Sequence, residues 1–101
     1  MFSVLTDHRL TSSDLAKVLK ALWEARSKWY NLGLELGISH GSLDAIKQDN
    51  LHVTGDCLSA MLREWLKRDQ PPPTWHSLSN VLESPTVNMG ELIKELPYGH
   101  N

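Results

Sequence analysis

The chain has 101 residues, which suits one domain with a single hydrophobic core. Apolar residues make up 41% of the chain and charged residues 22%, so the composition excludes wholesale disorder. Ten Lys and Arg residues against twelve Asp and Glu residues give a net charge of −2. This balance argues against a domain that binds a nucleic-acid backbone, because such binding requires concentrated basic residues.

The cysteine count and the hydropathy pattern bear on where the domain works. One cysteine cannot form an internal disulfide, and no asparagine begins an N-x-Ser/Thr glycosylation site, so a reduced compartment, the cytoplasm, is favoured. No apolar run approaches the ~20 residues of a membrane span. The apolar stretch at residues 2–5 is too short for a signal peptide. We therefore expect no membrane contact by this domain.

Residues 1–10 are predicted to be a lead-in before the first helix. Its apolar residues either rest on the core or belong to a disordered start: Phe2, Val4, Leu5 and Leu10. The first helix is predicted to begin at Thr11, with Asp14 three residues later as in a capping box, and to end between Glu24 and Arg26. Apolar residues recur at helical spacing on its inner face: Leu15, Val18, Leu19 and Leu22.

Two shorter helices are predicted next, at residues 27–36 and 40–48. Gly37 is expected to end the first of them in a left-handed conformation, and Ser39 is expected to cap the second. Four apolar residues of the second of these helices and of the connection after it are expected to anchor the chain on the core: Leu43, Ile46, Leu51 and Val53.

The strongest helical pattern covers residues 54–68. At ~100° per residue its apolar side chains occupy about half of the helix circumference. A stripe of this width exceeds what a contact with one helix needs, so this helix is expected to be central and to contact several neighbours. Thr54 is predicted to cap its first turn. The three prolines at 71–73 prevent its continuation, because proline lacks the backbone N–H.

A fifth helix is predicted to begin after its cap Thr74 and to stop at Ser84, which precedes a proline. A sixth is predicted to begin with a capping box at residues 88–91 and to end at Pro97. No segment alternates between apolar and polar residues as a strand does. Six short helices joined by short loops predict a compact all-α bundle.

The order of aromatic residues and glycines resembles a death domain. Four motifs carry the resemblance: Trp29-x-x-Leu32-Gly33-x-x-Leu36-Gly37-Ile38, Leu43-x-x-Ile46, Cys57-x-x-x-Met61-Leu62-x-x-Trp65-Leu66 and Thr74-Trp75-x-x-Leu78-x-x-x-Leu82. The resemblance covers residues 11–97, which we take as the expected domain, with residues 98–101 as a tail. It implies a six-helix antiparallel Greek-key bundle, the death fold.

The resemblance also implies a function. Death domains are non-enzymatic adaptor modules that bind other death domains and assemble apoptotic or innate-immune signalling complexes, so the implied partners are other death-domain proteins or a second copy of this chain. No cofactor, small-molecule substrate or nucleic acid is implied. Caspase-recruitment and death-effector domains share the bundle, but Trp29 and the Thr74-Trp75 pair favour the death domain. A helical nucleic-acid-binding domain is a further alternative, and the acidic stretch at residues 35–56 speaks against it.

Trp29, Trp65 and Trp75 could form a binding surface, since tryptophan is frequent at interaction hot spots. Each of them lies on the apolar face of its helix, and burial of a large ring stabilises a small domain, so we expect them in the core. Trp23 lies at the edge of its apolar stripe and stays undecided. The expected core consists of Trp29, Leu32, Leu36, Ile46, Leu58, Met61, Leu62, Trp65, Trp75, Leu78 and Leu82.

The charged residues are separated along the chain. Residues 14–28 carry a local charge of +2, and residues 35–56 a local charge of −3. In the family's bundle, the first and fourth helices form one docking surface and the second and third form its counterpart. The resemblance therefore implies a basic interaction patch of Lys17, Lys20, Arg63 and Lys67. It implies an acidic interaction patch of Glu35, Asp44 and Asp49. The competing reading is that these are ordinary solvated faces.

No constellation of residues indicates catalysis or a metal site. Cys57 lies on an apolar helix face, where the pKa of a thiol rises, so it is expected to be a small buried hydrophobe. The five histidines lack the close pairing of metal ligands. Tyr30 and Leu34, four residues apart, are expected to be partly buried. We accordingly predict no catalytic, cofactor-binding or metal-binding residues.

Overall fold

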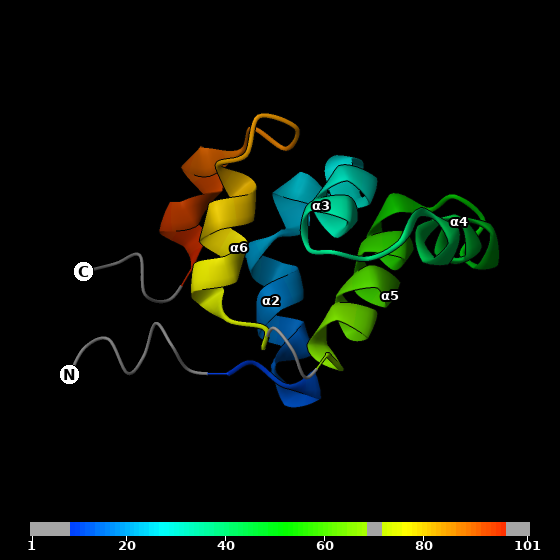
Figure 1. Cartoon of the computed structure of the whole chain (residues 1–101), viewed down its shortest axis with the longest axis horizontal. Coiled ribbons are helices and arrows are strands. Elements are labelled where there is room, and N and C mark those ends of the chain that lie inside the picture. The colour runs from blue at the N-terminus through cyan, green and yellow to red at the C-terminus, as the bar shows by residue number, and fades with distance from the viewer. Residues whose placement is uncertain (1–8, 69–71, 97–101) are drawn as a thin grey trace.

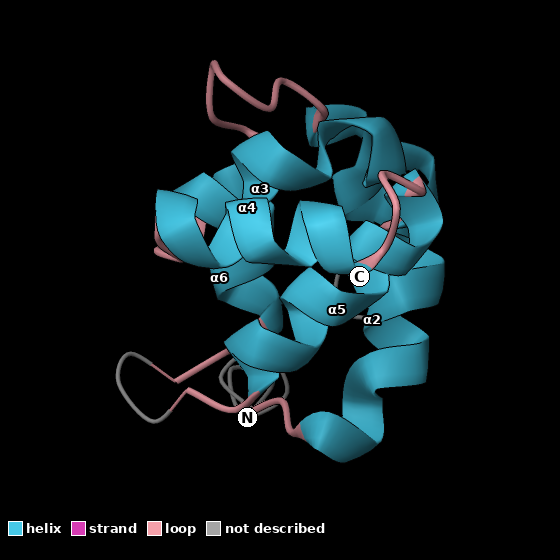
Figure 2. Cartoon of the chain, turned by 90° about the vertical axis from the view of Figure 1, so that its right-hand side faces the viewer, coloured by secondary structure: helices cyan, strands magenta, loops and turns pink. Residues whose placement is uncertain are grey.

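The computed structural model describes residues 9–68 and 72–96, and every regular element within these ranges is helical (Figure 1). The five α-helices are α2 (Leu15–Ala21), α3 (Trp29–Glu35), α4 (His40–Asp49), α5 (Thr54–Leu66) and α6 (Trp75–Leu82). The 3-10 helices are η1 (Ser12–Asp14), η2 (Trp23–Lys28) and η3 (Gly90–Glu95). Figure 2 shows these helices packed against one another and joined by loops. The all-α prediction is confirmed for this part of the chain.

The region predicted as the first helix is divided into three elements. Thr11 and Asp14 form the predicted capping box, in which the Asp14 carboxylate accepts a hydrogen bond of 2.9 Å from the Thr11 N–H. The α-helix ends earlier than predicted, because Leu22 leaves the α-helical region with φ −102° and ψ 8°. The chain then forms η2, and α3 begins at Trp29 rather than at Ser27.

Helix α5 is the helix around which the others pack. It contacts α2, α3, α4 and η2, and in Figure 1 it runs between α2 and α4. Its broad apolar stripe is fully buried: Cys57, Leu58, Met61, Leu62, Trp65 and Leu66. The prediction that Thr54 caps this helix is wrong. Val53 is the N-cap residue, because its carbonyl already accepts the Cys57 N–H at 2.9 Å, and no side chain caps this end.

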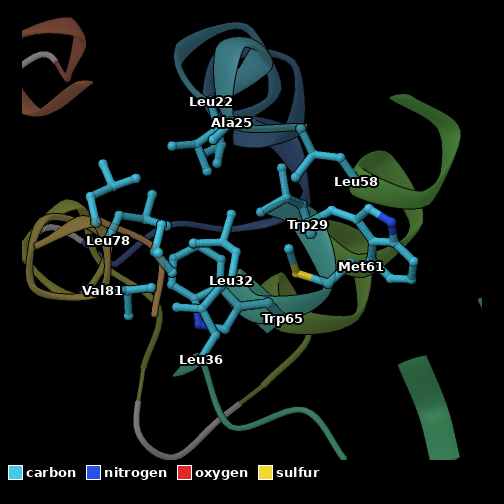
Figure 3. Close-up of a cluster of buried hydrophobic side chains, with 14 of the residues drawn as sticks. Leu22, Ala25, Trp29, Leu32, Leu36, Leu58, Met61, Trp65, Leu78 and Val81 are labelled. Carbon is cyan, nitrogen blue, oxygen red and sulfur yellow. The ribbon is translucent and has the colours of Figure 1, made fainter. Parts of the chain in front are cut away.

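The core lies where α3 packs against both α5 and α6, and where α2 packs against α5. Figure 3 shows ten labelled side chains from these elements and η2 converging. All eleven residues expected in the core are buried, with at most 9% of their surface exposed. Gly33 permits a close approach inside this core: a Cβ at this position would lie 2.7 Å from a methyl carbon of Leu43 and 3.1 Å from Met61 Cγ. The absence of a side chain therefore lets α3 pack tightly against its neighbours.

The fifth predicted helix is present as α6. Thr74 accepts a hydrogen bond of 3.0 Å from the Ser77 N–H, as its predicted capping role requires. The sixth predicted helix is the 3-10 helix η3, and the predicted capping box at its start is wrong: Met89 is the N-cap residue and makes no side-chain capping bond. The short element nevertheless covers the core, since Leu92 and Leu96 are buried.

Helix α3 ends as the sequence predicts. Gly37 adopts the left-handed conformation, with φ +92°. The Gly37 N–H donates to the Leu34 carbonyl at 3.0 Å, and the Ile38 N–H donates to the Gly33 carbonyl at 2.9 Å. These two bonds define a Schellman motif, in which glycine is the usual left-handed residue. Ile38 then returns to the core, where it is buried.

Helix α4 ends in the same motif without a glycine. The Leu51 N–H donates to the Gln48 carbonyl at 3.2 Å, and the His52 N–H donates to the Lys47 carbonyl at 3.0 Å. Leu51 is the left-handed residue of this motif, with φ +51°, and His52 after it also has a positive φ of +64°. Leu51 and Val53 are exposed, so the expectation that they anchor the connection on the core is wrong. The side chain of Leu51, the left-handed residue of this motif, therefore lies in solvent at the turn.

The chain joins the bundle at Leu10. Its side chain is buried and its N–H donates to the Pro73 carbonyl at 2.8 Å, so this residue of the lead-in contacts the core. The other apolar residues of the lead-in, Pro71 and the predicted tail lie outside the described residues. None of the helices within 9–68 and 72–96 has the length and apolar character needed to span a membrane.

Candidate protein-interaction surfaces

The four residues of the predicted basic patch lie on two helices in contact. Lys17 and Lys20 are exposed on α2, and Arg63 is exposed near the end of α5, which Lys67 follows directly. We call these four residues the basic face. The regular helical spacing places residues three or four apart on the same side of each helix. The cations of the basic face thus stand on two rigid helices, α2 and α5, that pack against each other.

The local partners of the basic face leave its charges accessible. Lys67 lies 3.7 Å from the Glu64 carboxylate, and more than half of each side chain is exposed. Such exposed pairs contribute only ~0.2–1 kcal/mol to stability, because solvent screens them and two long side chains must be ordered. Arg63 donates to the Ser59 hydroxyl over 3.5 Å. Both cations can exchange these weak contacts for an external carboxylate.

The predicted acidic patch lies on the next pair of contacting helices. Glu35 is exposed on the last turn of α3, and Asp44 and Asp49 are exposed on α4. We call these three residues the acidic face. Helix α3 contacts both α4 and α5, so the acidic and basic faces belong to different elements of one rigid bundle.

A polar network around Tyr30 fixes the position of Asp44. The Tyr30 hydroxyl donates to the Asp44 carboxylate at 2.8 Å and lies 3.3 Å from His40 Nδ1. Lys47 Nζ stands 6.0 Å from the centre of the Tyr30 ring. The hydrogen bond to Asp44 raises the pKa of the Tyr30 phenol above its ordinary value, with smaller contributions from burial and from the negative charge. Tyr30 is partly buried, as is Leu34, in agreement with the sequence-based expectation.

Glu35 takes part in a second set of contacts, which ties α3 to the loop after α6. The Thr86 hydroxyl donates to the Glu35 carboxylate at 2.8 Å, and the Asn31 side chain donates to the Thr86 carbonyl at 3.4 Å. One turn earlier, Lys28 Nζ donates to the Val87 carbonyl at 2.9 Å. Lys28 is therefore a structural cation rather than part of a free basic surface. The exposed Glu35 keeps oxygen lone pairs for a further partner.

Sequence reasoning missed the role of Arg68, the last residue of the strongest helical pattern. Its guanidinium donates to the Leu36 carbonyl at 2.9 Å and to the Gly37 carbonyl at 3.0 Å. Its own carbonyl accepts a hydrogen bond of 2.7 Å from Arg9. Arg68 thus ties the end of α5 to the end of α3. The available signal was the end of α3 at Gly37, because the last carbonyls of a helix need hydrogen-bond donors from elsewhere. The donor, Arg68, lies 31 residues away from Gly37 along the chain.

Cys57 is buried and lies one turn into α5. Its thiol faces the Ile46 carbonyl at 4.0 Å. Burial raises the pKa of this thiol, and the charge of Asp56 adds to the rise while Lys47 opposes it. Cys57 is therefore a small buried hydrophobe, as predicted. Within residues 9–68 and 72–96, no three or more His, Cys, Asp and Glu side chains gather as a metal ion would require.

The chain matches a known protein family. The family model described as Death domain matches residues 12–95, which is most of the chain. The match confirms the resemblance drawn from the tryptophan and glycine motifs, and with the helical architecture it confirms the predicted fold class. No curated protein gives a significant match, and no solved structure does.

Proposed function

Because the chain belongs to the death-domain family, we propose that it binds other death domains and thereby assembles signalling complexes of cell death or innate immunity. Membership of the family makes it a protein-interaction module of the death-fold superfamily, and modules of this kind are non-enzymatic. The finer assignment to a cytoplasmic adaptor is part of the proposal. The burial of Cys57, which raises the pKa of its thiol, supports a non-catalytic role.

The observation that carries the proposal is the separation of charge between two pairs of helices. The basic face lies on α2 and α5, whereas the acidic face lies on α3 and α4. A contact between the basic face of one domain and the acidic face of another joins two different surfaces. Such a contact is heterologous, so each bound pair still offers one free face of each sign and the assembly can extend.

The mechanism is the presentation of fixed charges by a rigid bundle. The hydrogen bond from Tyr30 holds the Asp44 carboxylate, and the one from Thr86 holds Glu35, so less side-chain freedom is lost on binding. Complementary charges chiefly set the orientation of the partners and the rate of encounter, and like charges repel wrong partners. Because each exposed ion pair contributes only ~0.2–1 kcal/mol, several pairs must form together.

The test is the effect of charge reversal on association measured by sedimentation velocity. We expect the wild-type chain to form assemblies of more than two chains at about 0.1 M NaCl and to lose these larger assemblies towards about 1 M, as the Debye length falls from ~10 to ~3 Å. Lys17→Glu with Lys20→Glu should abolish these larger assemblies, and Asp44→Lys with Asp49→Lys on a second chain should partly restore them. Lys94→Glu, which reverses an exposed cation on η3, is the matched control. Unchanged association of the Lys17 and Lys20 double variant would remove the assignment.

A further inference from the structure

The described residues expose three large hydrophobic side chains. Leu51 is 80% exposed, Val53 51% and Trp23 41%; no other large hydrophobic of residues 9–68 and 72–96 is exposed to this degree. The Trp23 ring lies against Gly55, where a Cβ would stand 2.4 Å from the ring. Gly55 follows Val53 by two residues. The contact places Trp23 against the first turn of α5, directly after the exposed Leu51 and Val53, and we call these three residues the apolar patch.

Leu51 contributes little to the stability of its own domain. It occupies the left-handed position of a Schellman motif, with φ +51°, where glycine is the usual residue because a side chain is disfavoured there. Its side chain is also the most exposed of the three. A residue that gains neither burial nor a favoured backbone conformation is free to serve an intermolecular contact. Val53 is likewise exposed, and it caps α5 without a side-chain bond.

The surroundings of the apolar patch carry both signs of charge. Glu24 and Arg26 follow Trp23 on η2, and the Arg26 guanidinium lies 4.8 Å from the centre of the Trp23 ring. Asp49 and Asp56 bracket the turn that carries Leu51 and Val53. Lys47 adds a second cation close to this turn, because its carbonyl accepts the His52 N–H at 3.0 Å. A rim of mixed sign can pair with a rotated copy of itself, whereas a rim of one sign would repel its copy.

We propose that the apolar patch is a two-fold contact between two copies of this chain. No second exposed apolar cluster exists among the described residues, so within residues 9–68 and 72–96 the apolar counterpart of the patch on one copy is the same patch on the other. A surface that meets itself is isologous and closes as a dimer. The carboxylates near the patch make an anionic membrane a poor alternative partner. This dimer goes beyond the proposed function, which uses the charged faces and extends without closing.

The two contacts respond oppositely to salt, which separates them experimentally. At about 1 M NaCl the charged contact is screened, whereas an apolar contact persists. We expect sedimentation equilibrium at this salt concentration to give a mass that rises with protein concentration to that of two chains and no further. Leu51→Ser with Val53→Ser should weaken the dimer at least tenfold. The matched control, Lys17→Glu with Lys20→Glu, should leave it unchanged.

Trp23 supplies an independent reading on the wild-type chain. The other three tryptophans are at most 6% exposed, so acrylamide quenching of the native fluorescence reports mainly on Trp23. Quenching should be efficient in the dilute monomer and should fall at least twofold on dimerisation. Either Leu51→Gly or the double serine variant should keep it efficient at all concentrations.

Three results would overturn the inference. A chain that stays monomeric at millimolar concentration has no such contact. A Trp23 ring already protected in the dilute monomer means that the patch is covered by the chain itself, and association that passes beyond two chains and depends on Leu51 means that the patch belongs to an extending contact. If the dimer forms at high salt while charge reversal has no effect at low salt, this inference stands and the proposed function fails.

Discussion

The turns that end α3 and α4 have the same backbone motif and opposite roles. After α3 the left-handed residue is Gly37, the next residue, Ile38, is buried, and Arg68 binds the free carbonyls. After α4 the left-handed residue is Leu51, and the residues that follow it are exposed. The turn after α3 has glycine at the left-handed position, a buried residue after it and hydrogen-bonded carbonyls, all of which favour stability. The turn after α4 departs from this pattern, since it has leucine at the left-handed position and exposed hydrophobic residues. The comparison indicates that departures of this kind mark surface used for something other than folding.

Gly37→Ala should give the largest effect on stability. Its Cβ would lie 2.6 Å from an Arg68 guanidinium nitrogen, and φ +92° disfavours any side chain. Backbone strain and the displaced hydrogen bonds together should lower the free energy of unfolding by about 2–3 kcal/mol. Urea unfolding followed by circular dichroism measures this. Gly41→Ala, where a Cβ meets nothing within 4 Å, is the matched control and should be neutral or slightly stabilising.

Arg68→Ala should give the next largest effect. It removes two hydrogen bonds to the carbonyls of Leu36 and Gly37 and should destabilise the domain by about 1–2 kcal/mol. Arg63→Ala removes a cation from the same helix end, but this cation makes only a 3.5 Å contact with Ser59, so its effect should stay below about 0.5 kcal/mol. Equal losses for the two variants would show that Arg68 acts only through its charge.

Leu51→Gly should stabilise the monomer by about 0.5 kcal/mol. Relief of left-handed strain outweighs the greater freedom of glycine in the unfolded chain. Val53→Gly is the control: Val53 has φ −76°, so glycine relieves nothing there and should destabilise by about 0.5–1 kcal/mol. Both should be measured by urea unfolding at low protein concentration. A loss of stability in Leu51→Gly would mean that Leu51 supports the fold, and the comparison between the two turns would then be wrong.

The smallest expected effect is on the reactivity of the buried Cys57 thiol, which lies near the connection between α4 and α5. Because the pKa of Cys57 is raised, its alkylation by iodoacetamide in the native state should keep accelerating above the ordinary thiol pKa of ~8.5. The unfolded thiol ionises first as the pH rises, so this group makes the native state less stable at high pH. Mass spectrometry at several pH values checks the profile. A profile that levels off near the ordinary pKa would contradict the burial of Cys57.

The helical core was predictable because its signals are local and redundant. Apolar side chains at helical spacing placed Trp29, Trp65 and Trp75 inside, and Gly37 identified the end of α3. The positions where prediction failed depend on neighbours or on exact backbone angles. Thr54 has the residue type of a cap, but backbone hydrogen bonds place the helix start one residue earlier in the chain, at Val53.

The surfaces were harder to predict than the core. Sequence identified which charges lie on which helix, but not that Lys28 and Arg68 are used inside the domain, since their partners lie 59 and 31 or 32 residues away. The apolar patch was missed for another reason. Leu51 and Val53 are hydrophobic, and a pattern-based reading places hydrophobic residues inside unless a left-handed backbone position is known.

The most direct test of the proposed function uses two neutralised variants. One carries glutamine at all four positions of the basic face, and the other carries Glu35→Gln, Asp44→Asn and Asp49→Asn. At about 0.1 M NaCl each variant alone has lost one face and should not extend through the charged contact. A 1:1 mixture should form heterodimers, one intact acidic face against one intact basic face, detected by native mass spectrometry with isotope-labelled chains. A mixture with no more heterodimer at low salt than at about 1 M NaCl would contradict the account.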